Sequence, residues 1–539
     1  MKVSAPQALA LRLRGNSRES EPSRPAPARG ASERAERPGS KRLWPALVAC
    51  LFLSALTLLW PATPTYDPWA WIMWGREVVD LDLVTDGGPS WKPLPVLFTI
   101  PFSLFGNDIA PLLWLWVARA GGLLSLVMAY RMGRRLTGGA IPGAIAGFVG
   151  AAFLATTYNY ARDAALGNSE PLLAAFALWA FERHLDGRRD HALYLGFAAA
   201  LLRPEVWPFL GLYGLWLMVR EPQLRVRVVA VGVLIPLLWF GPEIWGSGDA
   251  LRASTRANDP NPQSAAFADN PGLEVAYRFH ERTIWPIEAG AALALILAIV
   301  AFVRRRAQGT VLFLAAAGLA WLVLVAVMTQ FGYAGNQRYL IVTTAALCVL
   351  GGVGVGRIFE GLRQATTRMV GDRPRLGLAA AAAVFLLGSL ALIPAIRDKV
   401  DNTERVVDKL GYEASLWEDL SGAIERAGGR DRLLRCGSIY TGPFQTQMMA
   451  YELGVHGLDV ADARLGTPAP GVAFRTNTIP NAPLTPVDDP RFREVAANRR
   501  WHVETVPRSD ARGRDCPAGG PGAPSAAPTP ATPELVSSR

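Results

Sequence analysis

The chain has 539 residues, 50% of them hydrophobic, and a mean hydropathy of +0.19, a composition that argues against an ordinary soluble protein. Its net charge of +10 comes largely from arginines gathered in short loops between long apolar runs. That distribution is typical of membrane topology, so the basic charge does not indicate a nucleic-acid-binding protein.

Residues 1–42 are polar, rich in Pro, Ala and Arg, and have no hydrophobic face, which predicts a disordered basic arm on the cytoplasmic side. The arm is too long and too polar to be the n-region of a cleaved signal peptide. The apolar run that follows therefore predicts an uncleaved anchor that enters the membrane from the cytoplasm.

Apolar runs recur up to residue 395, and the longest reach the ~20 residues that span a bilayer core. Because the backbone must hydrogen-bond with itself there, they predict helices, about eleven in number. Switching sides at each helix places every arginine cluster in the cytoplasm, as the positive-inside rule requires, and leaves 63–110, 158–170, 246–285 and 330–338 outside. The predicted helices lie near 43–62, 111–130, 141–157, 171–183, 192–202, 204–219, 227–245, 286–303, 309–329, 339–356 and 376–395.

The odd number of crossings places the C-terminal region, residues 396–515, outside the membrane. Within it, 406–429 has a helical pattern, and 432–460 is typical of a strand, a Gly turn, a helix and a second strand. The expected fold is therefore an all-α polytopic membrane bundle over 43–395 with a small C-terminal extracytoplasmic α/β domain.

Two further features lie in the C-terminal part of the sequence: a possible disulfide and a low-complexity segment. Cys436 and Cys516 lie in or beside this outer domain, where a disulfide between them is reasonable but cannot be established from sequence. The tail 516–539 is a low-complexity Pro/Ala-rich segment, which predicts disorder.

Asp67 follows the first apolar run, directly before Pro68. Asp is a favoured N-cap and Pro is favoured at the next position, so Asp67 is predicted to cap a helix over the following residues. A carboxylate where the chain leaves the bilayer could also do chemistry in an outward-facing cleft, and the two roles are compatible. Lys92, in the stretch SWKPLP, is either an interfacial lysine or a phosphate contact. Asp82 belongs to a D-x-D motif, which usually marks a solvated turn and is an alternative candidate for a metal or sugar site.

Other ionisable residues fall near predicted helix ends, where such groups are costly and usually functional if they face a cavity. Arg162 either contacts a lipid phosphate or pairs with Asp163 or Glu170. Arg338 either contacts a lipid phosphate as well or only anchors its helix at the membrane interface. Tyr339 beside it could contact the phosphate. Arg203 and Glu205 interrupt an apolar segment and need partners, which could be each other.

The order of these features resembles the GT-C glycosyltransferases, polytopic enzymes that take sugars from polyprenyl-phosphate carriers. The nearest branch holds protein O-mannosyltransferases and the aminoarabinose transferases of lipid A. The resemblance covers roughly 43–360 and lies in Asp67 before WIMWGREVVDLDL, in WKPLPVLFTIPFSLFG, in ARAGGLLSLVMAYRMGRRLTGG, in NYARDAALGNSEPLLAAFALWAF and in GNQRYLIVTTAALCVLGGVGVG. The chain departs from the family in having Pro68 in place of a second acid and Lys-Pro-Leu-Pro in place of Lys-Pro-Pro, so metal dependence and the exact donor do not carry over.

The resemblance implies an enzyme that transfers a sugar from a polyprenyl-phosphate donor to an acceptor at the outer face of a bacterial plasma membrane. Direct displacement would use Asp67 as the general base, and cations would stabilise the departing phosphate. The acceptor is left open among a glycan, a glycolipid and a protein. The residues expected to bind the lipid phosphate or sugar are Lys92, Arg162, Glu170, Arg338 and Tyr339, with Asp82, Arg203 and Glu205 as further candidates.

No metal site is predicted, because the five histidines show no paired ligand spacing, although a divalent cation is left open. No nucleotide-binding loop occurs either. Two other classes of protein are considered: a polytopic transporter or flippase, which would usually show matching repeats with broken helices, and a non-catalytic membrane scaffold that displays the C-terminal domain.

Overall fold

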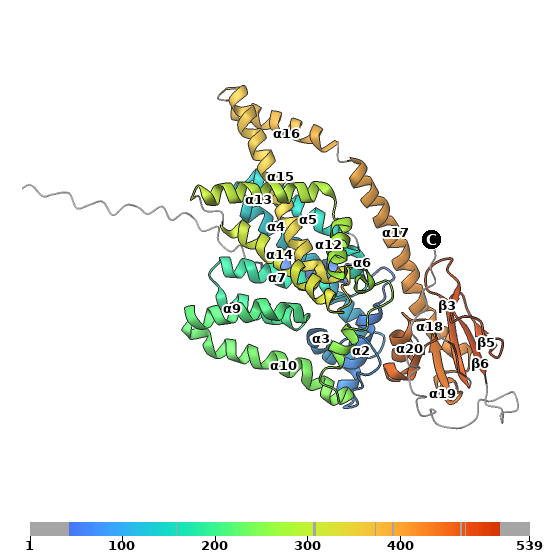
Figure 1. Cartoon of the computed structure of the whole chain (residues 1–539). Coiled ribbons are helices and arrows are strands. Elements are labelled where there is room, and N and C mark those ends of the chain that lie inside the picture. Colours follow the sequence, from blue (N-terminus) through green and yellow to red (C-terminus); the bar gives the residue numbers. More distant parts are fainter. Residues whose placement is uncertain are drawn as a thin grey trace, which may run out of the picture. The chain divides into compact units, whose positions relative to one another are not determined.

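The computed structural model describes residues 43–157, 159–305, 309–371, 373–390, 393–463, 466–468 and 470–506. The predicted arm, the predicted tail and Cys516, and therefore the predicted Cys436–Cys516 bond, lie outside these residues. The described part is mostly helical, with a mixed sheet near its C-terminal end (Figure 1).

A helix occupies each of the eleven apolar ranges found in the sequence. The described elements include five that are long and apolar enough to cross a membrane: α4, α13 and α14, and α10 and α15 together with the short turns before them. The other six helices are shorter or less apolar, so eleven crossings stay a prediction. The bounds are α1 (Trp44–Thr57), α4 (Ala110–Thr137), α5 (Ile141–Thr156), α7 (Glu170–Leu185), α8 (Arg189–Ala200), α9 (Trp207–Arg220), α10 (Arg225–Ser247), α13 (Trp285–Val303), α14 (Gly309–Gln330), α15 (Ile341–Met369) and α16 (Pro374–Leu390).

Helix α15 is central to the bundle, where it packs against α5 and α13. The close approach of α15 to α5 and α13 depends on small residues. A Cβ on Gly352 would overlap the backbone of Ala146 and Gly150 in α5, and one on Gly354 would overlap Gly290 in α13. Small residues at such crossings let helix backbones meet closely, which is the packing that stabilises helix pairs in lipid.

The segments between these helices carry shorter elements, and most of them lie near the site described below. They are α2 (Tyr66–Val79), α3 (Pro93–Ser103), α6 (Tyr160–Ala165), η1 (Pro204–Val206), η2 (Pro222–Leu224), α11 (Arg252–Ala257), η3 (Ala265–Phe267), α12 (Pro271–Arg282) and η4 (Gln337–Leu340).

Helix α2 starts one residue before Asp67, so the prediction that Asp67 is its N-cap is wrong. Thr65 occupies the N-cap position, without a side-chain cap, and Asp67 lies inside the first turn. A carboxylate there still suits the positive end of the helix dipole. The Asp67 carboxylate accepts a hydrogen bond from Arg338 and not from the free backbone N–H groups at the helix start.

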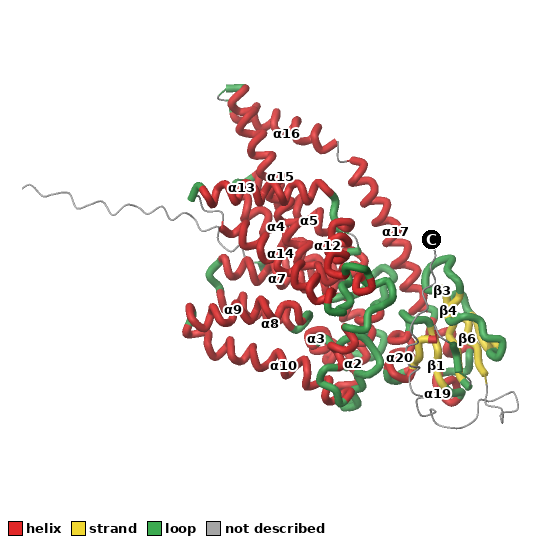
Figure 2. The backbone as a smooth tube through the Cα atoms, viewed as in Figure 1, coloured by secondary structure: helices red, strands yellow, loops and turns green. Residues whose placement is uncertain are grey.

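The C-terminal region begins with α17 (Ile393–Glu418), and a mixed sheet follows (Figure 2). The sheet order is β2-β1-β3-β6-β5, with β4 paired to β3; β1 runs parallel to β2 and β3, and the remaining pairs are antiparallel. The strand, helix and strand expected within 432–460 are present as β1, α20 and β2. The bounds are α18 (Leu420–Arg426), α19 (Arg430–Arg435), β1 (Ser438–Thr441), α20 (Thr446–Leu453), η5 (Gly457–Asp459), β2 (Val460–Asp462), β3 (Gly471–Asn477), β4 (Leu484–Thr485), β5 (Arg493–Ala497) and β6 (His502–Val506).

The sheet and helix α2 share one hydrophobic core, which runs from the tryptophans of α2 to Trp501. The ring of Trp69 lies 5.1 Å from that of Trp417 and 5.2 Å from that of Tyr451 on α20. Arg76 stacks on the Tyr451 ring and donates to its backbone carbonyl. The C-terminal region therefore holds the helix that carries Asp67.

Candidate active site

Six ionisable side chains from five separate elements meet next to the start of α15. They carry three positive and three negative formal charges, so the cluster is neutral as a whole. Burying charges is tolerated only when they are paired, and here each has an opposite partner. The six are Asp67 of α2, Lys92 before α3, Glu170 at the start of α7, Arg203 and Glu205 at η1, and Arg338 of η4.

Arg338 joins the two sides of this cluster. Its Nη2 atom lies 2.6 Å from Oδ2 of Asp67, and its Nε atom lies 3.8 Å from Oε1 of Glu170. Nη1 also donates to the side-chain oxygen of Asn168 at 3.3 Å. The arginine is held at the turn before α15, so its guanidinium occupies a fixed position between two carboxylates.

Glu170 is the common partner of all three cations. Its Oε1 atom lies 3.4 Å from Nζ of Lys92 and 3.1 Å from Nη1 of Arg203. Lys92 also donates to the hydroxyl of Ser169 at 3.0 Å. Glu170 begins helix α7, so the helix dipole favours its negative charge as well.

Arg203 and Glu205 are each other's partners, as the sequence allowed. Nη2 of Arg203 lies 2.8 Å from Oε1 of Glu205, and the Tyr333 hydroxyl donates to the same oxygen at 2.8 Å. The guanidinium carbon of Arg203 lies 3.6 Å above the centre of the Tyr339 ring. Tyr339 therefore contacts an arginine of the cluster directly, and its role toward a phosphate stays a prediction.

Exposure separates the three cations. The side chain of Arg338 is 26% exposed, against 8% for Lys92 and 4% for Arg203. Asp67 is the most exposed of the acids, at 12% of its side chain. A ligand entering the cluster would therefore meet Arg338 and Asp67 first, and the remaining charges form the layer behind them.

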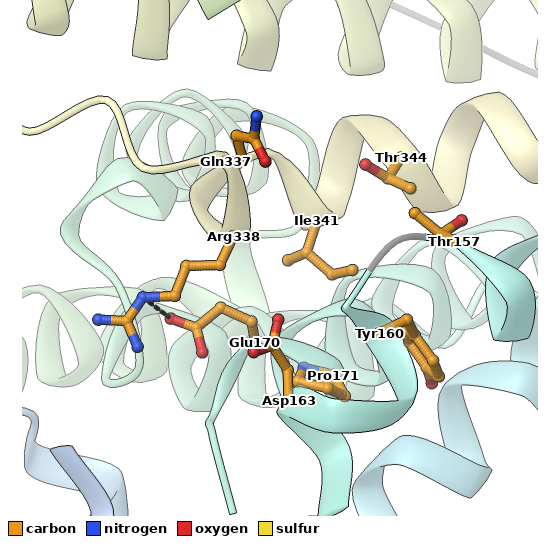
Figure 3. A pocket seen from close by; sticks show the side chains of 9 residues that line it. All are labelled: Thr157, Tyr160, Asp163, Glu170, Pro171, Gln337, Arg338, Ile341 and Thr344. Atoms are coloured by element: carbon orange, nitrogen blue, oxygen red, sulfur yellow. Dashed lines mark ion pairs between the residues drawn. The ribbon is translucent and has the colours of Figure 1, made fainter. Parts of the chain in front are cut away.

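A pocket opens beside Arg338 and Glu170, and Figure 3 shows the side chains that line it. Its cavity volume is about 20 Å³, enough for one or two water molecules. The walls come from the end of α5, from α6, and from the starts of α7 and α15. The lining residues are Thr157, Tyr160, Asp163, Glu170, Pro171, Gln337, Arg338, Ile341 and Thr344.

Two of the predicted residues lie outside the cluster. Arg162 forms an ion pair of 2.7 Å with Glu413 of α17, so it joins that helix to α6. Asp82 is 74% exposed and lies 3.3 Å from Nε2 of His456, past the opposite end of α2 from Asp67. Among the described residues, no group of three or more His, Cys, Asp or Glu side chains is placed to hold a metal ion.

Several polar residues around the cluster were not predicted from the sequence. Asn168, Ser169 and Tyr333 contact its members, and no local pattern marks them. A buried pair was also missed: Nε of Arg252 lies 2.7 Å from Oε2 of Glu243, which also accepts from the hydroxyl of Thr85. A signal existed for Glu243, because an acid inside an apolar helix needs a partner.

Comparison with known proteins gives likenesses of structure alone. No protein-family model matches the chain, and no curated protein matches it. The chain is similar to the crystal structure of ArnT from Cupriavidus metallidurans bound to undecaprenyl phosphate, with 15% identity and a TM-score of 0.49, over 86% of this chain and 98% of that one. It is also similar to the apo state of the same ArnT, with 15% identity, a TM-score of 0.46 and the same coverage. The function proposed below rests on the residues of this chain.

Proposed function

We propose that the chain transfers a sugar from a polyprenyl-phosphate donor to an acceptor at the outer face of the plasma membrane. The observation that supports this proposal is the position of Arg338. It lies at the start of a helix long enough to cross a membrane, it is the most exposed cation of the cluster, and it touches Asp67. A phosphate at the membrane surface would find there a cation, and a carboxylate beside it.

In the proposed reaction an acceptor hydroxyl attacks the anomeric carbon of the sugar. The bond from that carbon to the phosphate oxygen breaks, and the lipid phosphate leaves with the electron pair. Asp67 takes the proton from the attacking hydroxyl, which makes it the general base. Arg338 and, behind it, Lys92 stabilise the charge that develops on the departing phosphate. Displacement in one step inverts the anomeric centre.

The Asp67–Arg338 ion pair gives this mechanism an order of events. A phosphate that binds Arg338 competes with Asp67 for the same guanidinium. The carboxylate then loses part of its pairing and becomes a better proton acceptor, because a nearby cation favours the ionised form of an acid. Binding of the donor thus makes Asp67 a stronger base.

The test is sugar transfer from synthetic undecaprenyl-phosphate sugars by purified protein. Asp67→Asn keeps the size of the side chain but removes the proton acceptor, and is expected to reduce transfer by about 10²–10⁴-fold with the fold intact. Asp80→Asn is the matched control, since Asp80 is exposed at the far end of α2, and should leave transfer unchanged.

Other outcomes would support a different catalytic base or a different class of protein. Equal activity of Asp67→Asn and wild type would remove Asp67 as the base and move the search to Glu170 and Asp163. No transfer by wild type with any acceptor, together with movement of the lipid across vesicle membranes, would instead support a flippase. Absence of both activities, in a protein that binds no polyprenyl phosphate, would support a scaffold.

A further inference from the structure

A buried ion pair outside the ionic cluster joins Glu243, near the end of α10, to Arg252, at the start of α11. Nε of Arg252 lies 2.7 Å from Oε2 of Glu243, and its Nη2 atom lies 3.1 Å from Oε1. The side chain of Glu243 is fully buried, and that of Arg252 is 10% exposed. An acid near the C-terminal end of an apolar helix is disfavoured by burial and by the helix dipole, so Glu243 requires this partner.

Both members of the pair also bind the segment 80–92, which joins α2 to α3 and contains no helix or strand. The hydroxyl of Thr85 donates to Oε2 of Glu243 at 2.9 Å. Nη2 of Arg252 donates to the backbone carbonyl of Pro89 at 2.9 Å. The ion pair therefore holds this segment at two separate points.

Further bonds attach the last part of the segment to the same two helices. The hydroxyl of Ser90 donates to the carbonyl of Ala253 in α11 at 2.8 Å. The indole of Trp91 donates to the carbonyl of Leu238 in α10 at 3.1 Å. A segment outside helices and sheets has to find hydrogen-bond partners elsewhere, and here α10 and α11 supply them.

Lys92 follows Trp91 directly, so its backbone position depends on these attachments. Its side chain reaches the ionic cluster, where Nζ lies 3.0 Å from the hydroxyl of Ser169 and 3.4 Å from Oε1 of Glu170. Nζ also lies 4.8 Å from the centre of the Trp71 ring. A shift of the segment would move this ammonium group away from all three contacts.

We propose that Glu243 and Arg252 are positioning residues, which fix the segment before Lys92 and so keep its ammonium group where it stabilises the departing phosphate. This inference rests on the function proposed above and adds two residues to it. A buried ion pair generally adds little stability over apolar residues of the same size, so stability alone does not account for this one. Positioning does, because a displacement of about 1 Å at a reacting site can cost about 10²-fold in rate.

The experiment replaces the pair by apolar side chains. Glu243→Met/Arg252→Met removes both bonds to the segment and leaves no buried charge behind, so the melting temperature in detergent should stay close to that of wild type. For transfer from undecaprenyl-phosphate sugars, kcat should fall about 10²-fold. KM should change little, because the more exposed Arg338 still binds the donor phosphate. Glu274→Met/Arg278→Met, at an ion pair within α12, is the control and should keep the wild-type kcat.

The same change in a Lys92→Met background separates positioning from a general structural effect. Lys92→Met should itself lower kcat. In its presence Glu243→Met/Arg252→Met should cost less than about threefold more, because residues that act through one group are not additive. Equal fold-losses with and without Lys92 would overturn the inference. An unchanged kcat in Lys92→Met or in Glu243→Met/Arg252→Met would overturn it as well.

If Glu243→Met/Arg252→Met does not fold, Thr85→Val makes the same comparison by removing only the hydroxyl that donates to Glu243. It should lower kcat about tenfold, and this loss should disappear in the Lys92→Met background. No loss, or an equal loss in both backgrounds, would again overturn the inference. Wild type that neither binds undecaprenyl phosphate nor transfers any sugar would instead overturn the proposed function itself.

Discussion

The guanidinium of Arg338 reaches Asp67 across 271 positions of sequence, with Nη2 2.6 Å from Oδ2. Neither residue has another partner of opposite charge at so short a distance in the described part of the chain. Asp67 and Arg338 are therefore each other's nearest opposite charge. A change in one residue is therefore felt by the second, both in stability and in ligand binding.

Removal of the arginine is expected to destabilise the protein. Arg338→Ala leaves Asp67 and Glu170 without a shared cation and should cost about 2 kcal/mol, below the figure for a fully buried pair because the arginine is partly exposed. The double variant Asp67→Asn/Arg338→Ala should recover part of that loss. Thermal unfolding in detergent measures both, and strictly additive effects of the two changes would show that the pair is not coupled.

The inner pair should be more sensitive than any surface pair. Glu205→Ala leaves the buried Arg203 guanidinium with Glu170 as its remaining acid, and about 3 kcal/mol of stability should be lost. Arg256→Ala breaks an exposed ion pair with Asp259 and should change stability by less than about 1 kcal/mol. Similar melting temperatures for the two variants would contradict the buried role of Glu205.

The contact between α2 and the C-terminal region should respond to pH through Glu77 and His456. The two side chains lie 2.9 Å apart, and Asp82 faces the other ring nitrogen of His456. Burial raises the pKa of Glu77 to about 7, and the His456 hydrogen bond opposes that rise only in part. Burial opposes the charged form of His456, but its hydrogen bond to Glu77 and the charges of Glu77, Asp82 and Asp459 raise its pKa overall.

Both folded-state pKa values are above the ordinary ones, so the folded contact holds extra protons. Its contribution to stability is complete below the ordinary pKa of glutamate and is lost as pH rises through about 7, the pKa of Glu77, and through the raised pKa of His456. Melting temperature should therefore fall between about pH 5 and pH 8 in wild type and fall less in Glu77→Gln. His502→Gln, at an exposed histidine paired with Glu494, is the control and should keep the wild-type slope.

Close packing at Gly87 should be essential for the position of α2. A Cβ there would overlap the backbone of Gly457 and Leu458, so Gly87→Ala must push the C-terminal region away from the loop after α2. Since a displacement of about 1 Å at a reacting group can cost about 10²-fold, kcat should fall far more than donor binding does. Gly411→Ala, where a Cβ meets no atom within 4 Å, is the control and should behave as wild type.

Local pattern in the sequence was enough for the helices and for part of the sheet. Each of the eleven apolar runs coincides with a helix, and the strand, helix and strand around Gly442 followed from alternation and turn residues. The cap assigned to Asp67 was wrong by two positions, because Thr65 and Asp67 are both acceptable helix starts and local sequence does not show that Asp67 pairs with the distant Arg338.

Pairings across long stretches of sequence could not be read in the same way. Tyr333 meets Glu205 over 128 positions, and Glu77 meets His456 over 379. Such contacts depend on which helix faces come together, and hydrophobic periodicity does not specify this. For the same reason the C-terminal region was expected as a separate domain, and its core shared with α2 was not foreseen.

The shared core of α2 and the sheet has a consequence for how the protein is made. Helix α2 leaves the ribosome early, but its packing partners extend to Trp501 and are synthesised long afterwards. Until those partners are made, Trp69 of α2 lacks the rings of Trp417 and Tyr451 that it packs against. A chain interrupted before residue 501 would contain its long apolar helices but would lack part of the core that supports α2. The support of α2 is thus complete only when the polypeptide is nearly complete.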